Sequence, residues 1–327
     1  MRVWFFTLVI CMSVASGCAQ KIQESAFLMN TNFSVTLYPR GSESKARSDI
    51  QAAFDLIRNL ELQFSTTIDD SMLSELNATG SAEFSPEGLR ILKACFQFHR
   101  QTDGAFDPSV YPLVRLWGFQ TTNQRVPTLP EIKKALGLVG LTRVVRLKGT
   151  RVSLERGSGL DFGGVLKGYA VDQALELLRS KGHQAGLVNA GGNLRVFGEK
   201  PGRSPWVIGI RHPRQEGEVI ALVSLKDGQA IATSGDYERY FTQNHNRYHH
   251  MIDPFTGSPA QNGMVSVSVI APDALTADAF STGLFVLGPH RAFQTAEALA
   301  FPLLIITSGK ETLSLSNNSL WIHYEAR

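Results

Sequence analysis

Two oxygen-bearing side chains stand four residues apart in a segment rich in Ala, Phe and Leu. Asp278 and Thr282 lie within residues 272–285, and this spacing puts both on one face of a helix. Carboxylate and hydroxyl oxygens suit Mg²⁺, which takes few protein ligands and completes its shell with water and phosphate oxygens. The spacing also fits a Thr hydroxyl bonded to the carbonyl four residues back, beside a solvated aspartate. A metal site is therefore one of two open interpretations.

Two glycine clusters could bring the backbone close to a ligand. Residues 157–169 run from a predicted strand into a predicted helix ended by Gly182, and free N–H groups at a helix entrance favour phosphate. This segment matches neither familiar phosphate-loop motif, so a tight packing turn is the alternative. In the second cluster, residues 187–193, glycine inside a strand pattern signals a bulge or the close passage of another group. Together the clusters favour a shared nucleotide or dinucleotide ligand.

Two adjacent histidines, His249 and His250, precede Asp253 in a glycine-bounded loop. Histidine beside a carboxylate suits proton transfer, because its unperturbed pKa lies near neutrality. A surface histidine with a local hydrogen bond is the alternative. A hydrolase would combine Ser234, His250 and Asp253, but Ser234 does not stand in G-x-S-x-G. A zinc site would use both histidines, yet adjacent residues of an extended run point to opposite faces.

The hydrophobic pattern predicts the elements that position these groups. Apolar residues recur at helical spacing around 50–62 and 89–96, where Cys95 is expected to fill the core. Further helices are expected around 131–135, 165–181 and 276–287. After a short tether, strands are expected at 33–38, 144–147, 151–154, 186–188, 207–210, 219–225, 265–270 and 303–306. Several strands follow one another directly. We therefore expect an α+β fold with a mainly antiparallel sheet, flanking helices and a helix-rich N-terminal part.

Composition excludes several classes of protein. The chain has 327 residues, 43% of them hydrophobic and 19% charged, which excludes a disordered or fibrous class. The net charge is +3 and no basic cluster is interleaved with aromatic residues, so we expect no nucleic-acid partner. The three cysteines, Cys11, Cys18 and Cys95, fit neither a disulfide framework nor a CxxC metal site.

The first eighteen residues are typical of an export signal. Arg2 precedes an almost wholly apolar stretch, residues 3–15, which is followed by Ser16-Gly17-Cys18. The apolar stretch is too short to span a bilayer as a helix. Residues 15–18 also resemble a bacterial lipobox, which would make Cys18 a lipidated first residue. We therefore expect residues 1–17 to be a signal peptide and 18–327 a membrane-anchored domain, with plain secretion as the alternative.

Taken in order, several stretches resemble the ApbE-type FAD:protein FMN transferases, exported bacterial enzymes that are often lipoproteins. The similarity runs from about Met29 to beyond Leu287. Any one block is weakly specific, whereas the ordered set is strongly specific. The matching stretches are 29–31, 70–71, 73–77, 104–108, 117–119, 161–169, 188–192, 232–237, 250–257 and 277–282.

The resemblance implies a cleft that binds FAD, with Mg²⁺ on the pyrophosphate. FMN would pass through a phosphoester to a Thr or Ser of a partner protein while AMP leaves. His250 would be the base, and a backbone oxygen of Gly164 would hold the metal together with Asp278 and Thr282. The implied FAD contacts are Met29, Ala105, Phe106, Asp107, Asp161, Lys167 and Ile252. The implied location is the bacterial cell envelope, facing the periplasm.

Three positions depart from the family pattern. Asn30 replaces the glycine of a Met-Gly-Thr motif, which would narrow the flavin entrance. Thr67 stands where many relatives carry a tyrosine, and Ser281 where some have a second acidic metal ligand. Two other functions stay open. One is hydrolysis of FAD to FMN and AMP, with water as the acceptor, and the other is a lipoprotein that stores FAD without turnover.

Overall fold

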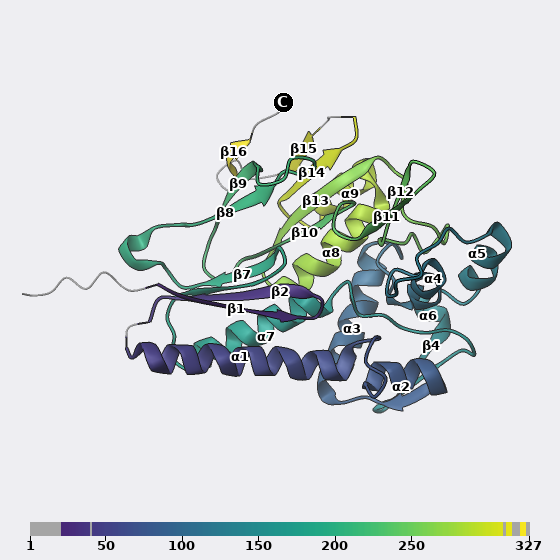
Figure 1. Cartoon of the computed structure of the whole chain (residues 1–327), viewed down its shortest axis with the longest axis horizontal. Coiled ribbons are helices and arrows are strands. Elements are labelled where there is room, and N and C mark those ends of the chain that lie inside the picture. The colour runs from purple at the N-terminus through teal and green to yellow at the C-terminus, as the bar shows by residue number, and fades with distance from the viewer. Residues whose placement is uncertain (1–20, 40, 310–311, 316–320, 325–327) are drawn as a thin grey trace, which may run out of the picture.

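The computed structural model describes residues 21–39, 41–309, 312–315 and 321–324. The predicted signal peptide and Cys18 lie outside this part of the chain. The main sheet has eight strands in the order β1-β2-β6-β7-β10-β13-β14-β15, and all neighbours pair antiparallel (Figure 1). The predicted α+β class with a mainly antiparallel sheet is confirmed. Within the same ranges, none of the helices combines the length and apolar character needed to cross a bilayer.

The strands of the main sheet are β1 (Ile22–Leu28), β2 (Thr31–Leu37), β6 (Gly186–Ala190), β7 (Asn193–Phe197), β10 (Ala230–Gly235), β13 (Met264–Ala271), β14 (Leu303–Thr307) and β15 (Thr312–Leu315). Two three-stranded sheets contain β3 (Ser81–Glu83), β4 (Val145–Lys148) and β5 (Arg151–Leu154), and β8 (Trp206–Arg211), β9 (Val219–Leu225) and β16 (Trp321–Tyr324). A separate two-stranded ribbon joins β11 (Tyr240–Gln243) to β12 (Asn246–His249).

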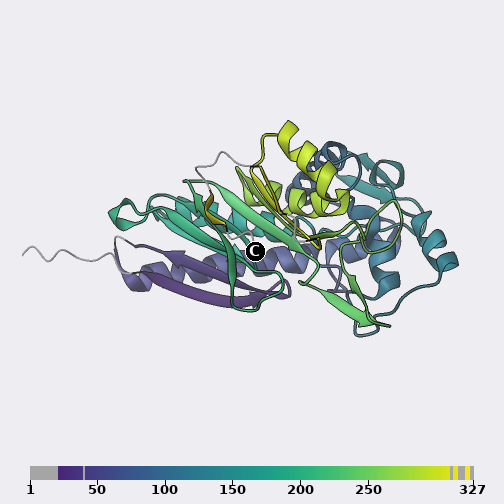
Figure 2. The same ribbon diagram turned by 90° about the horizontal axis from the view of Figure 1, so that it is seen from above.

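The helices are α1 (Glu43–Phe64), α2 (Met72–Thr79), α3 (Pro86–Gln101), α4 (Tyr111–Trp117), α5 (Leu129–Leu136), α6 (Leu141–Val144), α7 (Leu166–Ser180), α8 (Ala274–Leu287) and α9 (Pro289–Ala298). Those of the first third of the chain after α1 gather at one end of the molecule (Figures 1 and 2). The main core, which includes the fully buried Cys95, lies between α1, α3, α7, α8 and one face of the main sheet. A second core lies between its other face and the sheet of β8 and β9.

Two of the differences from the sequence prediction concern the N-terminal segment and the second glycine cluster. Residues 22–28, expected as part of a tether, form the edge strand β1. Gly191 and Gly192, expected as a bulge within one strand, form the two-residue turn between β6 and β7. Their φ angles of 59° and 109° are positive, as two-residue hairpin turns of this type require.

The turn between β1 and β2 explains how asparagine can replace glycine at position 30. Met29 and Asn30 adopt φ angles of 50° and 56°, so the turn has two residues in the left-handed region. Asparagine tolerates that region better than most residues with a Cβ. Met29 is less suited to it, and its N–H donates a hydrogen bond to Glu61 Oε1 on α1 at 2.9 Å. This bond helps to hold the turn at the edge of a polar cavity.

Helices α7 and α8 cap each other. Asp278 on α8 accepts the N–H of Gly168 in the first turn of α7 at 2.9 Å. Asp172 on α7 accepts the N–H groups of Ala274 and Leu275 at the start of α8, each at 2.9 Å. The first N–H groups of a helix lack partners within it, and the helix dipole favours a carboxylate there. The two aspartates therefore hold the beginnings of both helices side by side.

The close approach of these helices requires glycine at position 168. A Cβ on Gly168 would lie 2.2 Å from the carbonyl oxygen of Ala274, so Gly168→Ala must push the helices apart. We expect this change to lower the free energy of unfolding by about 1–3 kcal/mol, measured by urea denaturation. Gly41→Ala is the matched control, because nothing lies within 4 Å of a Cβ there. Equal stability of the two variants would contradict the packing described.

Candidate active site

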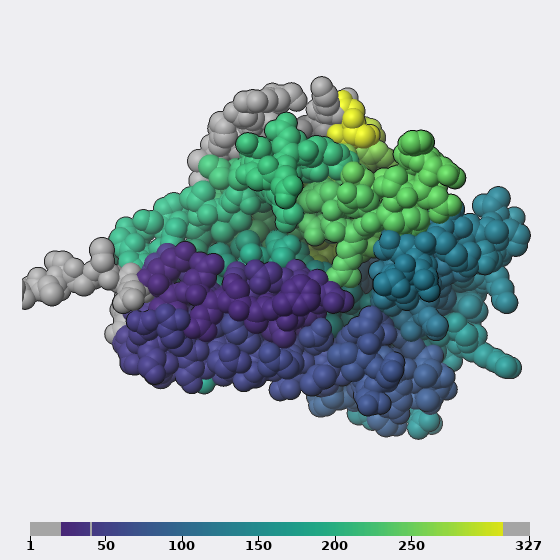
Figure 3. Space-filling model, in the orientation of Figure 1, coloured from purple at the N-terminus to yellow at the C-terminus, as the bar shows by residue number. Residues whose placement is uncertain are grey.

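A cavity of about 620 Å³ opens where the β1–β2 turn, α1, α7, α8 and residues 233–252 meet. The surface is hollowed between the purple N-terminal strands and the green segment above them (Figure 3). The cavity is lined by every residue assigned to the site from the sequence: Met29, Ala105, Phe106, Asp107, Asp161, Gly164, Lys167, His250, Ile252, Asp278 and Thr282. The fold thus brings together positions far apart in the sequence, and their individual roles stay predictions.

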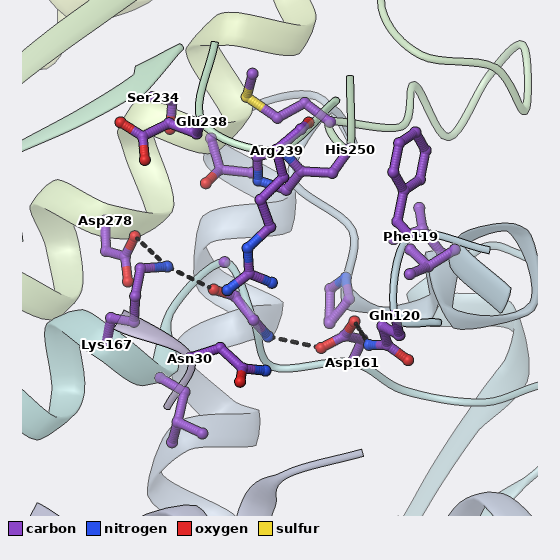
Figure 4. Close-up of a pocket in the computed structure, with 18 of the residues that line it drawn as sticks. Asn30, Phe119, Gln120, Asp161, Lys167, Ser234, Glu238, Arg239, His250 and Asp278 are labelled. Carbon is purple, nitrogen blue, oxygen red and sulfur yellow. Dashed lines mark hydrogen bonds and ion pairs between the residues drawn. The ribbon is translucent and has the colours of Figure 1, made fainter. Parts of the chain in front are cut away.

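A row of polar contacts crosses the cavity (Figure 4). Lys167 Nζ lies 3.9 Å from Asp278 Oδ1 and donates to the carbonyl oxygen of Gly163 at 3.1 Å. The N–H of Gly163 donates in turn to Asp161 Oδ1 at 2.8 Å. Gln120 Nε2 donates to Asp161 Oδ2 at 2.8 Å. The glycine segment therefore positions a lysine and an aspartate on the cavity wall.

Several of the N–H groups at the start of α7, which the glycine pattern indicates as a possible phosphate site, are taken by the protein itself. The N–H groups of Val165 and Leu166 both donate to the carbonyl oxygen of Phe162, at 2.9 and 2.8 Å. The Gly168 N–H is taken by Asp278. An anion at this helix would therefore meet Lys167 and any cation held by Asp278.

Three oxygen donors on one wall fit a hard cation. A Cβ on Gly164 would lie 3.5 Å from Thr282 Oγ1, and Asp278 stands one turn before Thr282 on α8. Asp278 is only 2% exposed, and its oxygens accept hydrogen bonds from the Gly168 N–H and from Asn193 Nδ2, at 2.9 and 2.8 Å. Each carboxylate oxygen keeps a further lone pair. This set suits Mg²⁺ with its remaining positions filled by water and phosphate.

Burial makes two of the cavity carboxylates, Asp161 and Asp278, respond strongly to a nearby positive charge. It raises the pKa of Asp278, against which the Lys167 ammonium and the Gly168 N–H act. It also raises the pKa of Asp161, against which the Gly163 N–H and the charges of Arg239 and Lys167 act. A divalent cation beside Asp278 would favour its ionised form. A cation bound at this wall would therefore stabilise the ionised carboxylate of Asp278.

His250 is positioned as a proton acceptor at the base of the ribbon. Its N–H and its Nδ1–H both donate to the carbonyl oxygen of Arg239, at 3.0 and 3.2 Å, which leaves Nε2 as the unprotonated nitrogen. Burial, followed by the charges of Arg239 and Lys167, lowers the pKa of His250 to about 3. The imidazole is therefore neutral at pH 7 and can take a proton. A phosphate bound beside it would raise its pKa.

A zinc site at the histidine pair is excluded by the direction of His249. Its Nε2–H donates to the carbonyl oxygen of Ala260 at 2.9 Å, and its ring packs edge-on against Phe285. His249 thus faces the core, whereas His250 lines the cavity. In the described ranges, no three His, Cys, Asp or Glu residues are grouped so that they could hold a metal ion.

The Ser-His-Asp arrangement also fails. The Ser234 hydroxyl pairs with that of Ser281 at 2.9 Å, and the Asp253 carboxylate accepts the N–H of Phe255 at 2.8 Å. Neither side chain is hydrogen-bonded to His250, whose Nδ1 partner is a backbone carbonyl instead. Ser281 is fully buried and donates to the carbonyl oxygen of Asp278 at 3.0 Å. It therefore does not take the place of a second acidic metal ligand.

The remaining predicted contacts form the less polar part of the cavity. Ala105, Phe106 and Ile252 are buried and line it, as expected for residues that face a flat ring system. Asp107 is different, because its carboxylate accepts the N–H groups of Ser109 and Leu141, at 2.8 and 3.0 Å. Its side chain thus holds the loop in place, and its side-chain oxygens are already engaged by these backbone donors.

An aromatic cluster fixes the ribbon and the histidine loop together. Phe241 and Tyr248 from the ribbon pack against Trp117, with ring centroids 6.5 and 5.5 Å away. Trp117 Nε1 also donates to the carbonyl oxygen of Gly257 at 2.9 Å. One buried indole therefore holds both the ribbon and the loop of residues 250–257.

Some cavity residues were missed by the sequence analysis. Glu238 and Arg239 follow directly after the recognised block 232–237, and only the pairing of the ribbon places them beside His250. Glu61 lies in a helical pattern that indicates an exposed position and nothing more. Gln120 follows the recognised block 117–119, but no spacing rule connects it to Asp161 forty-one residues later.

Known proteins are similar to this chain in sequence and in fold. The pattern of the ApbE family matches residues 29–304. An FAD:protein FMN transferase of Vibrio cholerae is 33% identical over 316 residues, which are 94% of each chain. The ApbE protein structure from Thermotoga maritima is 37% identical, with a TM-score of 0.86 over 91% of this chain and 98% of its own. The flavinyl transferase ApbE of Pseudomonas stutzeri is 31% identical, with a TM-score of 0.80 over 91% and 95% of the two chains.

Proposed function

The chain belongs to the ApbE family and is a flavin transferase, and from this premise we propose that it moves FMN from FAD to a Thr or Ser hydroxyl of an acceptor protein, with release of AMP. The observation that carries the proposal is the arrangement of the cavity. A neutral histidine stands on one side, and three oxygen donors with a lysine stand on the wall formed by α7 and α8.

The cavity offers FAD two kinds of surface, one apolar and one positively charged. Ala105, Phe106 and Ile252 offer apolar surface for the ring systems. Lys167 offers an ammonium group to the diphosphate. A cavity of about 620 Å³ is in the range that encloses small-molecule ligands.

The oxygen donors of Gly164, Asp278 and Thr282 would hold Mg²⁺ against this diphosphate. When bound there, the ion would supply charge neutralisation to the phosphate oxygens and to the AMP that leaves. Asp278 contributes the one carboxylate of the set, and its contacts with Gly168 and Asn193 fix its orientation. Few protein ligands are needed, because phosphate and water complete the shell of this ion.

The transfer needs one proton acceptor and no covalent intermediate on the protein. The acceptor hydroxyl oxygen attacks the phosphorus on the FMN side, and His250 Nε2 takes its proton. The bond from that phosphorus to the bridging oxygen breaks, and the oxygen leaves with AMP. Phosphoryl transfer of this kind depends on positioning and electrostatic stabilisation. Water in place of the acceptor would give free FMN.

We further propose that the enzyme is exported and held at the membrane of the cell envelope by lipid on Cys18. The support is the order of a basic residue, an apolar stretch and Ala15 to Cys18 in the sequence. The full-length chain should fractionate with membranes, and a Cys18→Ala variant should not. Retention of the variant at the membrane would contradict the anchor.

The activity is tested by incubating the mature chain with FAD, Mg²⁺ and a Thr-containing acceptor peptide. We expect AMP and a flavinylated peptide in equal amounts, measured by chromatography and mass spectrometry, and neither product in the presence of EDTA. His250→Gln should lower kcat about 10²–10⁴-fold, because a general base contributes that much. Asp278→Asn should lower it at least about a hundredfold, since it removes the negative charge but keeps an oxygen for the Gly168 N–H.

Two outcomes of the same assay would contradict transfer. AMP with free FMN, with no peptide modified, would identify a hydrolase. Tight FAD binding without AMP would identify a storage protein. Asp172→Asn is a matched control, because Asp172 caps a helix in the same way and is absent from the cavity lining. Its folded fraction should retain activity.

A further inference from the structure

Arg239 brings a second cation to the cavity, from the side opposite α7 and α8. It directly precedes β11 and lines the cavity. Figure 4 shows its guanidinium extending into the centre of the cavity, between Lys167 and Asp161. No motif or spacing in the sequence indicates a role for it.

The two cationic side chains of the cavity, Lys167 and Arg239, differ in how much the protein itself uses their hydrogen-bond donors. Lys167 donates to Gly163 and lies 3.9 Å from Asp278. The Arg239 guanidinium forms no hydrogen bond or ion pair with any residue in the described part of the chain. A guanidinium carries five N–H donors in a rigid fork that matches two oxygens of a phosphate. Its donors are thus available to a ligand.

Arg247 shows that an arginine of this ribbon can be satisfied by the protein itself. Its guanidinium lies 4.2 Å from the centre of the Tyr240 ring and 3.5 Å from Asp236. Arg247 does not line the cavity. The two arginines therefore share a residue type and a structural element, but only Arg239 points its charge at the site.

The backbone of Arg239 is also the hydrogen-bond partner of His250, the proposed general base. Its carbonyl oxygen accepts the N–H and the Nδ1–H of His250, at 3.0 and 3.2 Å. The guanidinium and the base are thus carried by one short piece of structure. A phosphorus atom approached by a hydroxyl that is bonded to His250 must lie on this side of the cavity. The oxygen donors of Asp278 and Thr282 lie on the other side.

On the basis of the transfer proposed above, we propose that Arg239 binds the non-bridging oxygens of the phosphate that stays with FMN. It stabilises the charge on these oxygens while the acceptor oxygen bonds to that phosphorus. In the same step the bond to the bridging oxygen breaks, and the hydroxyl proton passes to His250 Nε2. Lys167 and the Asp278 wall serve the phosphate that leaves with AMP. The diphosphate is thus held from both sides.

The charge of Arg239 has a second, measurable effect on the base. Arg239 on the same side of the cavity, Lys167 across it and the adjacent His249 each lower the pKa of His250 after burial has done so. Glu238 is the acidic residue that lines this side of the cavity with them. Removing the Arg239 charge therefore raises the pKa of His250. The acidic limb of the activity profile should move to higher pH, because the imidazole then takes a proton more easily.

The test compares Arg239→Gln and Arg239→Lys with the matched control Arg247→Gln in the AMP and flavinylation assay. We expect Arg239→Gln to lower kcat about 10²–10³-fold, with KM for FAD changed less than about threefold. Arg239→Lys should recover part of kcat, since it keeps a charge but not the forked donors. Arg247→Gln should stay within about twofold of the unaltered enzyme. The acidic limb should shift upward only in Arg239→Gln.

Each other outcome has a definite meaning. If the unaltered enzyme and Arg247→Gln are active and Arg239→Gln matches them, the role of Arg239 is wrong while the transfer function stands. A rise in KM alone, with kcat unchanged, would show that Arg239 binds only the ground state and would overturn the proposal. If neither the unaltered enzyme nor the control releases AMP, the transferase function itself fails, and this inference fails with it.

Discussion

The site depends on one buried carboxylate that must find donors. Asp278 is almost removed from solvent, and an ionised carboxylate in such a place is costly unless it is hydrogen-bonded or paired. Its partners come from separate parts of the chain: the Gly168 N–H from α7, the Asn193 amide from the start of β7, and the Lys167 ammonium. The same contacts that satisfy Asp278 therefore assemble one wall of the cavity. Asp172 makes the converse contact to α8 and fixes the pair of helices.

The opposite wall carries nitrogen groups, the His250 imidazole and the Arg239 guanidinium, where the first wall carries oxygen donors. The ribbon of β11 and β12 is separate from the main sheet, and its aromatic face is held by Trp117. At its base, one carbonyl oxygen orients His250, and the side chain of the same residue, Arg239, extends into the cavity. A diphosphate between the two walls would meet hard oxygen donors for a cation on one side. On the other side it would meet a neutral base and a guanidinium.

The sequence predicts this site well where chemistry and local spacing coincide. Asp278 and Thr282 share a helix face, as their spacing of four indicates, and adjacent histidines point apart, as an extended run requires. The fold class also follows, because neighbouring strands that are joined by a short turn can pair only antiparallel. The ordered family blocks supply the members of the site that spacing alone cannot connect, such as Met29 and Asp161.

Other features depend on contacts that no local pattern encodes. Gly168 is required by a neighbouring carbonyl more than a hundred residues away, and Arg239 meets His250 only through the pairing of the ribbon. The two glycine clusters indicated a phosphate loop and a bulge. In the structure, the first gives several of its N–H groups to the protein and the second is a hairpin turn. The glycines therefore indicate correctly where the backbone turns sharply, whereas contacts with residues distant in sequence determine which structure each cluster forms.

In the proposed transfer, a divalent cation and a flavin dinucleotide occupy one site together, against the wall built around Asp278. Calorimetric titration of Mg²⁺ into the protein, with and without saturating FAD, tests this most directly. Shared occupation predicts that FAD tightens Mg²⁺ binding at least about tenfold and that Mg²⁺ tightens FAD binding by the same factor, because such coupling is reciprocal. Affinities that are independent of each other would contradict the account.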